Sequence, residues 1–515
     1  MRFADFFRIK SLDAILKESE EPGRELKKVL GTSDLLLLGI GAIIGAGIFA
    51  TVGTAAAGDI GRPGAGPALI LSFALTGFAC GFAALCYAEF AALVPISGSA
   101  YTYSYATLGE LIAWIIGWDL IIEYAVGNVA VAISWSGYFV ELLRGLGLHL
   151  PAWACIDYRT AMQGFTRAGE QLAQGASLES MGQGMQSAWH AVHDAPRIFG
   201  VPIIANVPAA GIVLLLTVVL VIGIRESSRF NAVMVGIKLV VLAFFVIIGS
   251  MYLKPANWTP FAPNGFAGIK AGAAIVFFAY IGFDAVSTVA EETKNPQKSL
   301  PIGIIGSLVV CTIIYMVVAA VFTGLVPYAD LTGALAHERA EPLTMAMKYI
   351  NLDWAAGIVA FGSVVAHTAV LLVFQLGQPR IFFSMARDGL LPSSFAKVHP
   401  KYKTPYVTTI ATGLAVAFFA SFMNIDEMVD LTNIGTLFAF ILVCLGVIVL
   451  RRSDPGRHRS FRVPWSPVVP AFGMVACVFL MTGLPVVTWI RFGIWLLAGF
   501  AIYLFYGRKH SRCSR

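Results

Sequence analysis

Charged residues are scarce in this chain. Asp, Glu, Lys and Arg make up 13% of its 515 residues, whereas hydrophobic residues make up 57%. This composition excludes an ordinary soluble domain and a disordered chain. The apolar residues form repeated long runs, and the short alternating segments of a membrane β-barrel are lacking. The sequence therefore predicts an all-α protein that crosses a membrane many times.

Several other signals are also lacking. The polar, mixed-charge N-terminus has neither the apolar core nor the cleavage site of a secretory signal. None of the seven cysteines has metal-ligand spacing, so we expect no metal, no cofactor and no disulfide framework. The net charge of +6 is spread over many loops, which does not indicate nucleic-acid binding.

Twelve apolar segments are long enough to cross a bilayer. Their approximate bounds are 33–55, 66–94, 106–140, 204–224, 230–253, 267–290, 302–326, 354–384, 405–424, 428–450, 466–485 and 487–507. Residues 1–30 are expected to form a tail before the first span. The first five spans fall within 31–253, the next five within 254–452, and the last two within 453–515 together with a C-terminal tail. Residues 141–203 are expected to form one long extracellular connection, a small cap in which 180–192 is helical, and we assign it no function.

Basic residues alternate between the two sets of connections. One set is rich in Lys and Arg, including Lys28, Lys294, Arg387, Arg451 and Arg508, whereas the short connections of the other set hold few. Because basic loops stay in the cytoplasm, we expect both termini to be cytoplasmic.

Glycine crowds the middle of the first span, at Gly39, Gly41, Gly45 and Gly47. Gly is less favourable than Ala in a helix by roughly 0.8–1 kcal/mol, so the helix unwinds most easily here. Gly45 lies about 18 Å into the span, near the middle of the hydrocarbon layer. Unpaired backbone groups at that depth must face protein or a polar ligand. The alternative is close helix packing, because Gly41 and Gly45 form a small-xxx-small pair.

The sixth span has the same feature, because Gly282 stands among aromatic residues at mid-depth and is followed by Asp284. Paired discontinuous helices, five spans apart, are typical of transporters built from inverted repeats. Their half-helix N-termini suit a carboxylate and their exposed carbonyls suit an ammonium group. The pair therefore favours a midplane site for a zwitterion over packing alone.

Five motifs resemble those of one family. They are Gly39–Phe49, Gly117–Tyr124, Phe278–Asp284, Glu291–Pro296 and Ala386–Pro392. In this order, over the whole chain, they resemble the amino acid–polyamine–organocation superfamily, in particular bacterial members related to cationic amino acid transporters. The resemblance implies a five-plus-five inverted-repeat (LeuT-like) fold with discontinuous helices 1 and 6, two further spans, and a place in the bacterial inner membrane. It also implies amino acid transport, usually coupled to protons.

The resemblance also places the substrate site on the unwound parts of spans one and six. These parts are Ile43, Gly45, Ala46 and Gly47, and Phe278, Ala279, Tyr280 and Ile281. Relatives often carry Thr or Ser where this chain has Ala46, so a hydroxyl contact is missing here. Ala46 and the apolar surroundings favour small or medium neutral amino acids.

Lys238 interrupts the fifth span about 10 Å from its cytoplasmic end. A charged side chain in the membrane interior is energetically costly and usually has a function, so Lys238 is a candidate functional residue. The resemblance implies that it accepts and releases the coupling proton while facing span one. The alternative is a structural charge paired with carbonyls of the broken first helix.

Further polar residues lie inside predicted spans. Asp119 and Glu123 share one helix face, and are either part of a polar network near the site or a hydrogen-bonded helix contact. His367 either titrates or is a hydrogen-bonded core residue, and we favour the core interpretation. Asn128 and Ser363 are candidates to line the path.

The sequence thus predicts a permease that moves amino acids inward with a proton, by alternating access. An amino acid exchanger is the alternative. A membrane enzyme would need clustered polar groups at one interface. A channel would need a continuous polar lining. The sequence indicates neither of these features. The expected partners are the amino acid, the proton and membrane lipid, and no oligomeric state is indicated.

Overall fold

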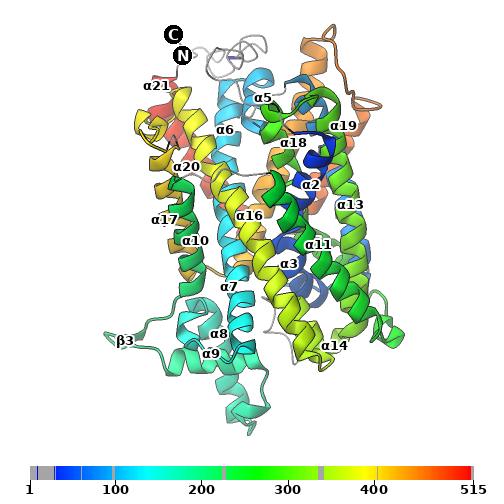
Figure 1. Ribbon diagram of the computed structural model, residues 1–515, viewed down its shortest axis with the longest axis vertical. Helices are drawn as coiled ribbons and strands as arrows, with labels where there is room; N and C mark the ends of the chain where they lie inside the picture. The colour runs from blue at the N-terminus through cyan, green and yellow to red at the C-terminus, as the bar shows by residue number, and fades with distance from the viewer. Residues whose placement is uncertain are drawn as a thin grey trace.

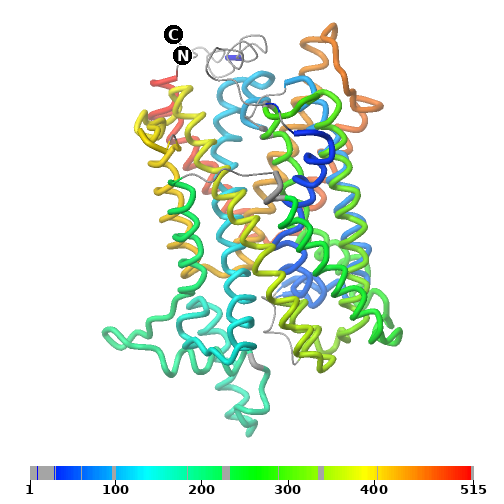
Figure 2. Tube along the Cα trace, viewed as in Figure 1, coloured from blue at the N-terminus to red at the C-terminus, as the bar shows by residue number. Residues whose placement is uncertain are grey.

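The chain is described by a computed structural model, in which residues 8–9, 28, 30–59, 61–94, 99–222, 228–333, 341–402 and 404–511 are described. Most of the predicted tail at 1–30 lies outside these residues. The described chain is a bundle of long helices that run along one common direction (Figure 1). Its last helix lies at one end, and the helices of the long 141–203 connection lie at the other (Figure 2).

The first half of the bundle contains the helices of the first five predicted spans. They are α2 (Thr32–Ile43), α3 (Ala46–Ala57), α4 (Leu69–Leu93), α5 (Ser99–Thr107), α6 (Glu110–Ile121), the π-helical η3 (Ile122–Val126), α7 (Gly127–Gly145), α10 (Val207–Ile222) and α11 (Ser228–Ser250). A π-helical turn inside an α-helix is rare and often marks a functional site. Here it holds Glu123, one of the predicted intramembrane carboxylates.

The second half follows in the same manner. It contains α12 (Gly265–Val276), η7 (Phe277–Tyr280), η8 (Phe283–Glu292), α13 (Pro296–Leu325), α14 (Tyr328–Thr332), α15 (Pro342–Tyr349), α16 (Asp353–Arg387), α17 (Tyr406–Phe422), α18 (Ile425–Ser453), α19 (Val468–Met481), α20 (Val486–Ile502), the π-helical η10 (Tyr503–Gly507) and α21 (Arg508–His510). Short 3-10 turns occur between them at η2 (Gly66–Ala68), η4 (Ala152–Ala154), η5 (Leu178–Ser180), η6 (Pro255–Trp258) and η9 (Ser393–Ala396).

The 141–203 connection folds into a small helical cap. Helices α8 (Tyr158–Ala173) and α9 (Gln183–His193) pack against each other around Ala161 and Ala191, and the hairpin β3 (Arg197–Ile198) and β4 (Val201–Pro202) follows. A second two-residue hairpin, β1 (Gly58–Asp59) and β2 (Arg62–Pro63), follows α3. Helix α9 confirms the helix predicted at 180–192, whereas α8 was not predicted. It begins where Asp157 caps it by accepting a hydrogen bond from the Thr160 amide.

Multi-pass membrane character is confirmed by length and apolarity. Among the described residues, eight helical stretches are long and apolar enough to cross a membrane, and the bent pair α2 and α3 makes a ninth. Three shorter apolar helices, α10, α17 and α19, coincide with the remaining predicted spans. The total of twelve crossings stays a prediction.

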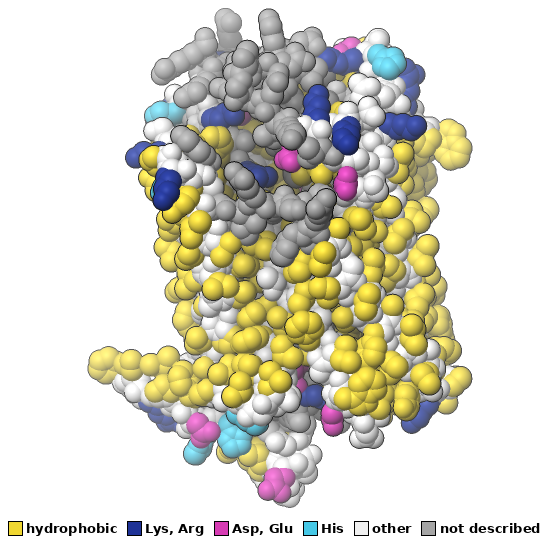
Figure 3. Space-filling view, in the orientation of Figure 1, with side chains coloured by type: hydrophobic (Ala, Val, Ile, Leu, Met, Phe, Trp, Pro, Cys, Tyr) yellow, Lys and Arg dark blue, Asp and Glu magenta, His cyan; other side chains and the backbone are white. Residues whose placement is uncertain are grey.

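The outer surface of the bundle also indicates a lipid environment. Large apolar side chains point outward, among them Phe78 (68% exposed), Leu497 (70%) and Phe505 (77%). On the face shown in Figure 3, such side chains cover the middle of the molecule, whereas Lys, Arg, Asp and Glu gather toward its two ends. An apolar belt of this size would be unstable in water, so it is the surface that contacts hydrocarbon.

Candidate functional site: two broken spans

The first predicted span is broken where its glycines lie. Helix α2 ends at Ile43 and α3 begins at Ala46, and the two helices are bent by 41°. Ile44 and Gly45 have non-helical backbones between them. A Cβ atom on Gly45 would lie only 2.4 Å from Cγ2 of Val370 in α16, so the break leaves room for glycine alone.

The sixth predicted span is broken in a similar manner. Its 3-10 segment η7 ends at Tyr280, Ile281 is extended, and η8 begins at Phe283. Gly282 has φ +116°, a left-handed conformation that favours glycine. The structure therefore contains both interruptions that the glycine positions predict.

The two breaks lie directly against each other. A Cβ atom on Gly47 would lie 2.1 Å from Cα of Ala279, and one on Gly282 would lie 2.7 Å from the carbonyl oxygen of Ala42. The hydroxyl of Tyr315 in α13 lies 2.8 Å from the carbonyl oxygen of Ile43 and 2.9 Å from that of Ala279. One side chain thus holds the end of α2 beside η7.

All eight predicted substrate-site residues are buried at this junction. They are Ile43, Gly45, Ala46 and Gly47 from the first break, and Phe278, Ala279, Tyr280 and Ile281 from the second. The Tyr280 side chain turns away toward α4, where its hydroxyl donates to the carbonyl oxygen of Phe73 at 2.8 Å. Tyr280 therefore anchors the break through its side chain and leaves its backbone at the junction.

Four helix ends converge at the junction. Helix α3 and η8 begin there without a side-chain cap, and α2 and η7 end there. The first N–H groups of a helix have no partner within it, and the helix dipole makes that end attractive to anions. The last carbonyls of a helix likewise lack a partner within it, and the helix dipole makes that end attractive to cations. The arrangement suits a small molecule that carries both charges.

Lys238 of α11 points at the first break from the side. Its Nζ donates a hydrogen bond of 2.7 Å to the carbonyl oxygen of Gly41, and the residue is 1% exposed. No carboxylate lies within ion-pair distance of it in the described part of the chain. The predicted contact between Lys238 and the first span is therefore present. It agrees equally with the proton-carrying role and with the structural alternative.

The predicted carboxylates lie beside η8 and α18. Glu123 in η3 is close enough to Asp284 of η8 and to Thr436 of α18 to interact with both. A Cβ atom on Gly435 would lie 2.9 Å from Oδ1 of Asp119, and neither oxygen of Asp119 accepts a hydrogen bond from any described residue. Asp119 and Glu123 thus both face α18, as their spacing predicts.

His367 is held in the core. Its Nδ1 donates to the carbonyl oxygen of Ser363 at 2.6 Å, since a carbonyl can only accept, and its Nε2 lies 2.9 Å from Oγ of Ser134. Ser363 itself donates to the carbonyl oxygen of Val359 at 2.7 Å. This geometry agrees with the core interpretation of His367. Asn128 differs, because neither polar atom of its buried side chain has a hydrogen-bond partner among the described residues.

Comparison with known proteins shows the family to which this chain belongs. A family profile described as amino acid permease matches residues 30–509, which is nearly the whole chain. The chain belongs to the amino acid permease family. The predicted resemblance to this superfamily is confirmed, and the relatives of this permease are transporters, not enzymes.

Three relatives illustrate the range of the similarity. The permease is 46% identical over 510 residues to a branched-chain amino acid permease of Bacillus subtilis, with 99% of both chains covered. It is 45% identical to a methylthioribose transporter of the same organism, over 99% of this chain and 100% of that one. It is 36% identical to the vacuolar cationic amino acid transporter 4 of Arabidopsis thaliana, over 87% of this chain and 67% of that one.

Sequence reasoning missed two tyrosines that fix the junction in the permease. Tyr315 joins the two breaks, and Tyr138 of α7 donates from its hydroxyl to the carbonyl oxygen of Phe49 at 2.6 Å. Both lie in apolar runs that carry no motif. The available signal was a lone hydroxyl at mid-span, which in a membrane needs a partner.

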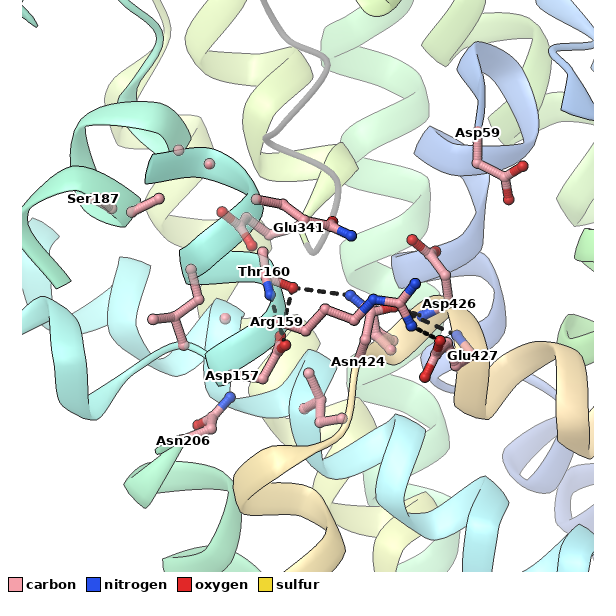
Figure 4. A pocket seen from close by; sticks show the side chains of 18 of the residues that line it. Asp59, Asp157, Arg159, Thr160, Ser187, Asn206, Glu341, Asn424, Asp426 and Glu427 are labelled. Atoms are coloured by element: carbon pink, nitrogen blue, oxygen red, sulfur yellow. Dashed lines mark hydrogen bonds and ion pairs between the residues drawn. The ribbon is translucent and has the colours of Figure 1, made fainter. Parts of the chain in front are cut away.

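The permease also has a cavity of about 760 Å³ at the α8–α9 end (Figure 4). Residues from α7, α8, α9, α15, α18 and α20 line it. Figure 4 shows Asp157, Thr160 and Ser187 of the cap on one side, and Asp59 and Asp426 on the other. Burial raises the pKa of the Asp157 carboxyl. No sequence motif indicated this cavity, because its walls come from distant parts of the chain.

Proposed function

We propose that this permease carries an amino acid into the cell together with a proton, by alternating access. The observation that carries the proposal is the junction of two broken helices, α2–α3 and η7–η8, held together by Tyr315. The amino acid carboxylate binds the N–H groups at the start of α3, and the ammonium group binds carbonyls at the ends of α2 and η7. In the transport cycle the broken pair and its neighbours rock against the remaining helices.

Twelve crossings and a five-plus-five inverted repeat are part of the proposal. The repeats comprise α2 to α11 and α12 to α18, followed by two further crossings. Arg387, Arg451 and Arg508 lie in the last turns of α16, α18 and α21, and by the positive-inside rule these helix ends face the cytoplasm. The cap of α8 and α9 is then extracellular. The Bacillus relatives support a place in a bacterial inner membrane.

Lys238 is proposed to carry the coupling proton. It is buried, hydrogen-bonded to the break at Gly41, and without a carboxylate partner among the described residues. Loss or gain of its proton therefore changes the hydrogen bond that holds α2. We predict that Lys238→Ala abolishes uptake driven by an inward proton gradient while amino acid still binds.

The measurement is uptake of labelled amino acid into proteoliposomes with an alkaline interior. Lys254→Ala is the matched control, because Lys254 is exposed just beyond the end of α11. Lys238→Arg keeps the charge but cannot release a proton near neutral pH, so we expect it to bind without gradient-driven uptake. Full acid stimulation in Lys238→Ala would reject the proton role.

The substrate is proposed to be a branched-chain or similar neutral amino acid. The junction is lined by apolar groups such as Phe278, Ile281 and Val370, and the branched-chain permease shares 46% of its residues with this chain. Methylthioribose is the second candidate, because the 45% identical transporter covers the chain equally well. Thermal-shift screening against the twenty amino acids and methylthioribose separates them. A sugar has neither charge of a zwitterion, so stabilisation by methylthioribose alone would contradict the zwitterion site.

Exchange of one amino acid for another is the alternative mode of transport. Counterflow in proteoliposomes without any proton gradient, together with no effect of an imposed gradient, would favour exchange. Uptake that follows the gradient and acidifies the lumen supports the symport proposed here.

A further inference from the structure

The cavity at the α8–α9 end has the size of a ligand site. Its volume is about 760 Å³, and small-molecule sites are typically about 300–1,000 Å³. Seven carboxylates and five basic side chains line it, and Arg62 behind the wall pairs with two of these carboxylates, Asp59 and Asp430, so the two signs of charge nearly balance. A lining that carries both signs of charge is suited to zwitterionic molecules.

The charges are fixed in position by contacts between the cap and α18. Arg159 of α8 pairs with Glu427 of α18, and Arg491 of α20 reaches the same carboxylate at 3.0 Å. Asn424, which caps α18, donates to Oγ1 of Thr160 at 2.9 Å. A guanidinium has five N–H donors, and the ion pair recorded for Arg159 among the described residues is the one with Glu427, so donors remain for a further carboxylate.

The opposite wall connects the cavity to the first broken span. Asp426 of α18 accepts a hydrogen bond of 3.2 Å from the hydroxyl of Thr54, which lies in α3. In Figure 4, Asp426 faces the cavity across from Asp157. Thr344 of α15, also in the wall, is 1% exposed, and its hydroxyl has no hydrogen-bond partner among the described residues. A buried hydroxyl without a partner indicates that a bound molecule or water completes this site.

We propose that this cavity is a second, outer binding site for the transported amino acid. Arg159 binds its carboxylate and Asp426 binds its ammonium group, before the molecule moves along α3 to the junction. The inference rests on the proposed function, because it takes the cargo to be an amino acid and this end to be extracellular. It gives the cap of α8 and α9 a role, namely the wall that holds the arriving molecule.

Binding stoichiometry tests the outer site. Equilibrium dialysis of tritiated L-leucine with the purified full chain should give two molecules bound per chain at saturation. Arg159→Gln and Asp426→Asn should each give one. Glu427 keeps its partner Arg491 in Arg159→Gln, so that variant leaves no carboxylate without a partner. Arg197→Gln is the matched control, because Arg197 is exposed in β3 of the same connection, and it should still bind two.

Native Cys155 supplies a second measurement, because its thiol lines the cavity. A membrane-impermeant thiol reagent should label Cys155 on intact cells, and L-leucine should slow the labelling at least fivefold. In Arg159→Gln the protection should disappear although leucine uptake continues with a raised KM. Protection that arose only from the central site would persist in this variant and would overturn the proposal.

The two proposals fail in different ways. One leucine bound per chain, with normal uptake in the same preparation, overturns the outer site and leaves the transport function intact. Two molecules bound in Arg159→Gln also overturn it. Loss of gradient-driven uptake of every amino acid by the wild-type chain, in contrast, would overturn the proposed function itself.

Discussion

Substitution of Gly47 by Ala tests whether the contact between the two breaks is needed for binding. A Cβ atom on Gly47 would lie 2.1 Å from Cα, 2.6 Å from Cβ and 2.7 Å from N of Ala279. Carbon atoms in contact are normally about 3.5–4.0 Å apart, so η7 would have to move by about 1.4 Å or more. The obstacle is backbone, which cannot rotate away as a side chain can. The two breaks must therefore separate.

Overpacking of this kind costs about 1–3 kcal/mol. If the cost falls on the junction, the affinity for the amino acid decreases by roughly 5–150-fold, since about 1.4 kcal/mol is a factor of ten. Equilibrium dialysis with a labelled amino acid measures this change, and a thermal melt of the same sample reports the effect on stability. We expect both the affinity and the melting temperature to decrease.

The control is Gly236→Ala in α11. A Cβ atom on Gly236 meets no heavy atom within 4 Å, and Gly236 is exposed on a helix that also carries Lys238. Ala is the better helix former by about 0.8–1 kcal/mol, so this variant should be as stable as the wild type or more so. If Gly47→Ala binds and transports as well as Gly236→Ala does, the breaks do not form the site and the reasoning is refuted.

Three further predictions follow from other contacts. Tyr315→Phe removes the hydroxyl that holds Ile43 and Ala279, so we expect the free energy of unfolding to fall by about 1–2 kcal/mol. The melting temperature and the uptake should both decrease. Unchanged uptake would show that this hydroxyl is dispensable. Glu89→Gln leaves the guanidinium of Arg451 without its buried carboxylate, so the thermal melt should show a loss of about 3–5 kcal/mol in the free energy of unfolding. Glu170 is exposed, and Glu170→Gln should show no loss. Burial raises the pKa of the Cys155 thiol to about 11. Its labelling rate should therefore rise about tenfold per pH unit between pH 8 and pH 10, because the thiolate is the reactive form. A plateau above pH 9 would contradict burial of this thiol.

The breaks were predictable because their cause is local. Gly45 and Gly282 sit in apolar runs where other residues would continue a helix, and the structure ends α2 and η7 beside them. Lys238 was visible for a similar reason, since a Lys inside an apolar segment must find a polar partner, and it finds the carbonyl of Gly41. The motifs that resemble amino acid transporters are likewise contained in short stretches.

Other features depend on how distant segments meet. The sequence left two interpretations of His367 open, and its contacts with Ser134 and Ser363 support the core interpretation. Helix α8 was missed because it lacks the long apolar run that marks a span, and its buried side chains meet those of α9 instead. The lone hydroxyl of Tyr315 indicated only that it needs a partner, and the sequence could not identify its two acceptors because they lie in other helices.

The sequence by itself therefore determined the membrane-spanning character, the places where two spans are interrupted and the family, because each of these follows from the composition or order of neighbouring residues. Only the tertiary structure decided that the interruptions touch, that one tyrosine joins them, and that Arg159 and Asp426 face the same cavity. Those facts concern side chains far apart along the chain, and their meeting is determined by how the helices pack.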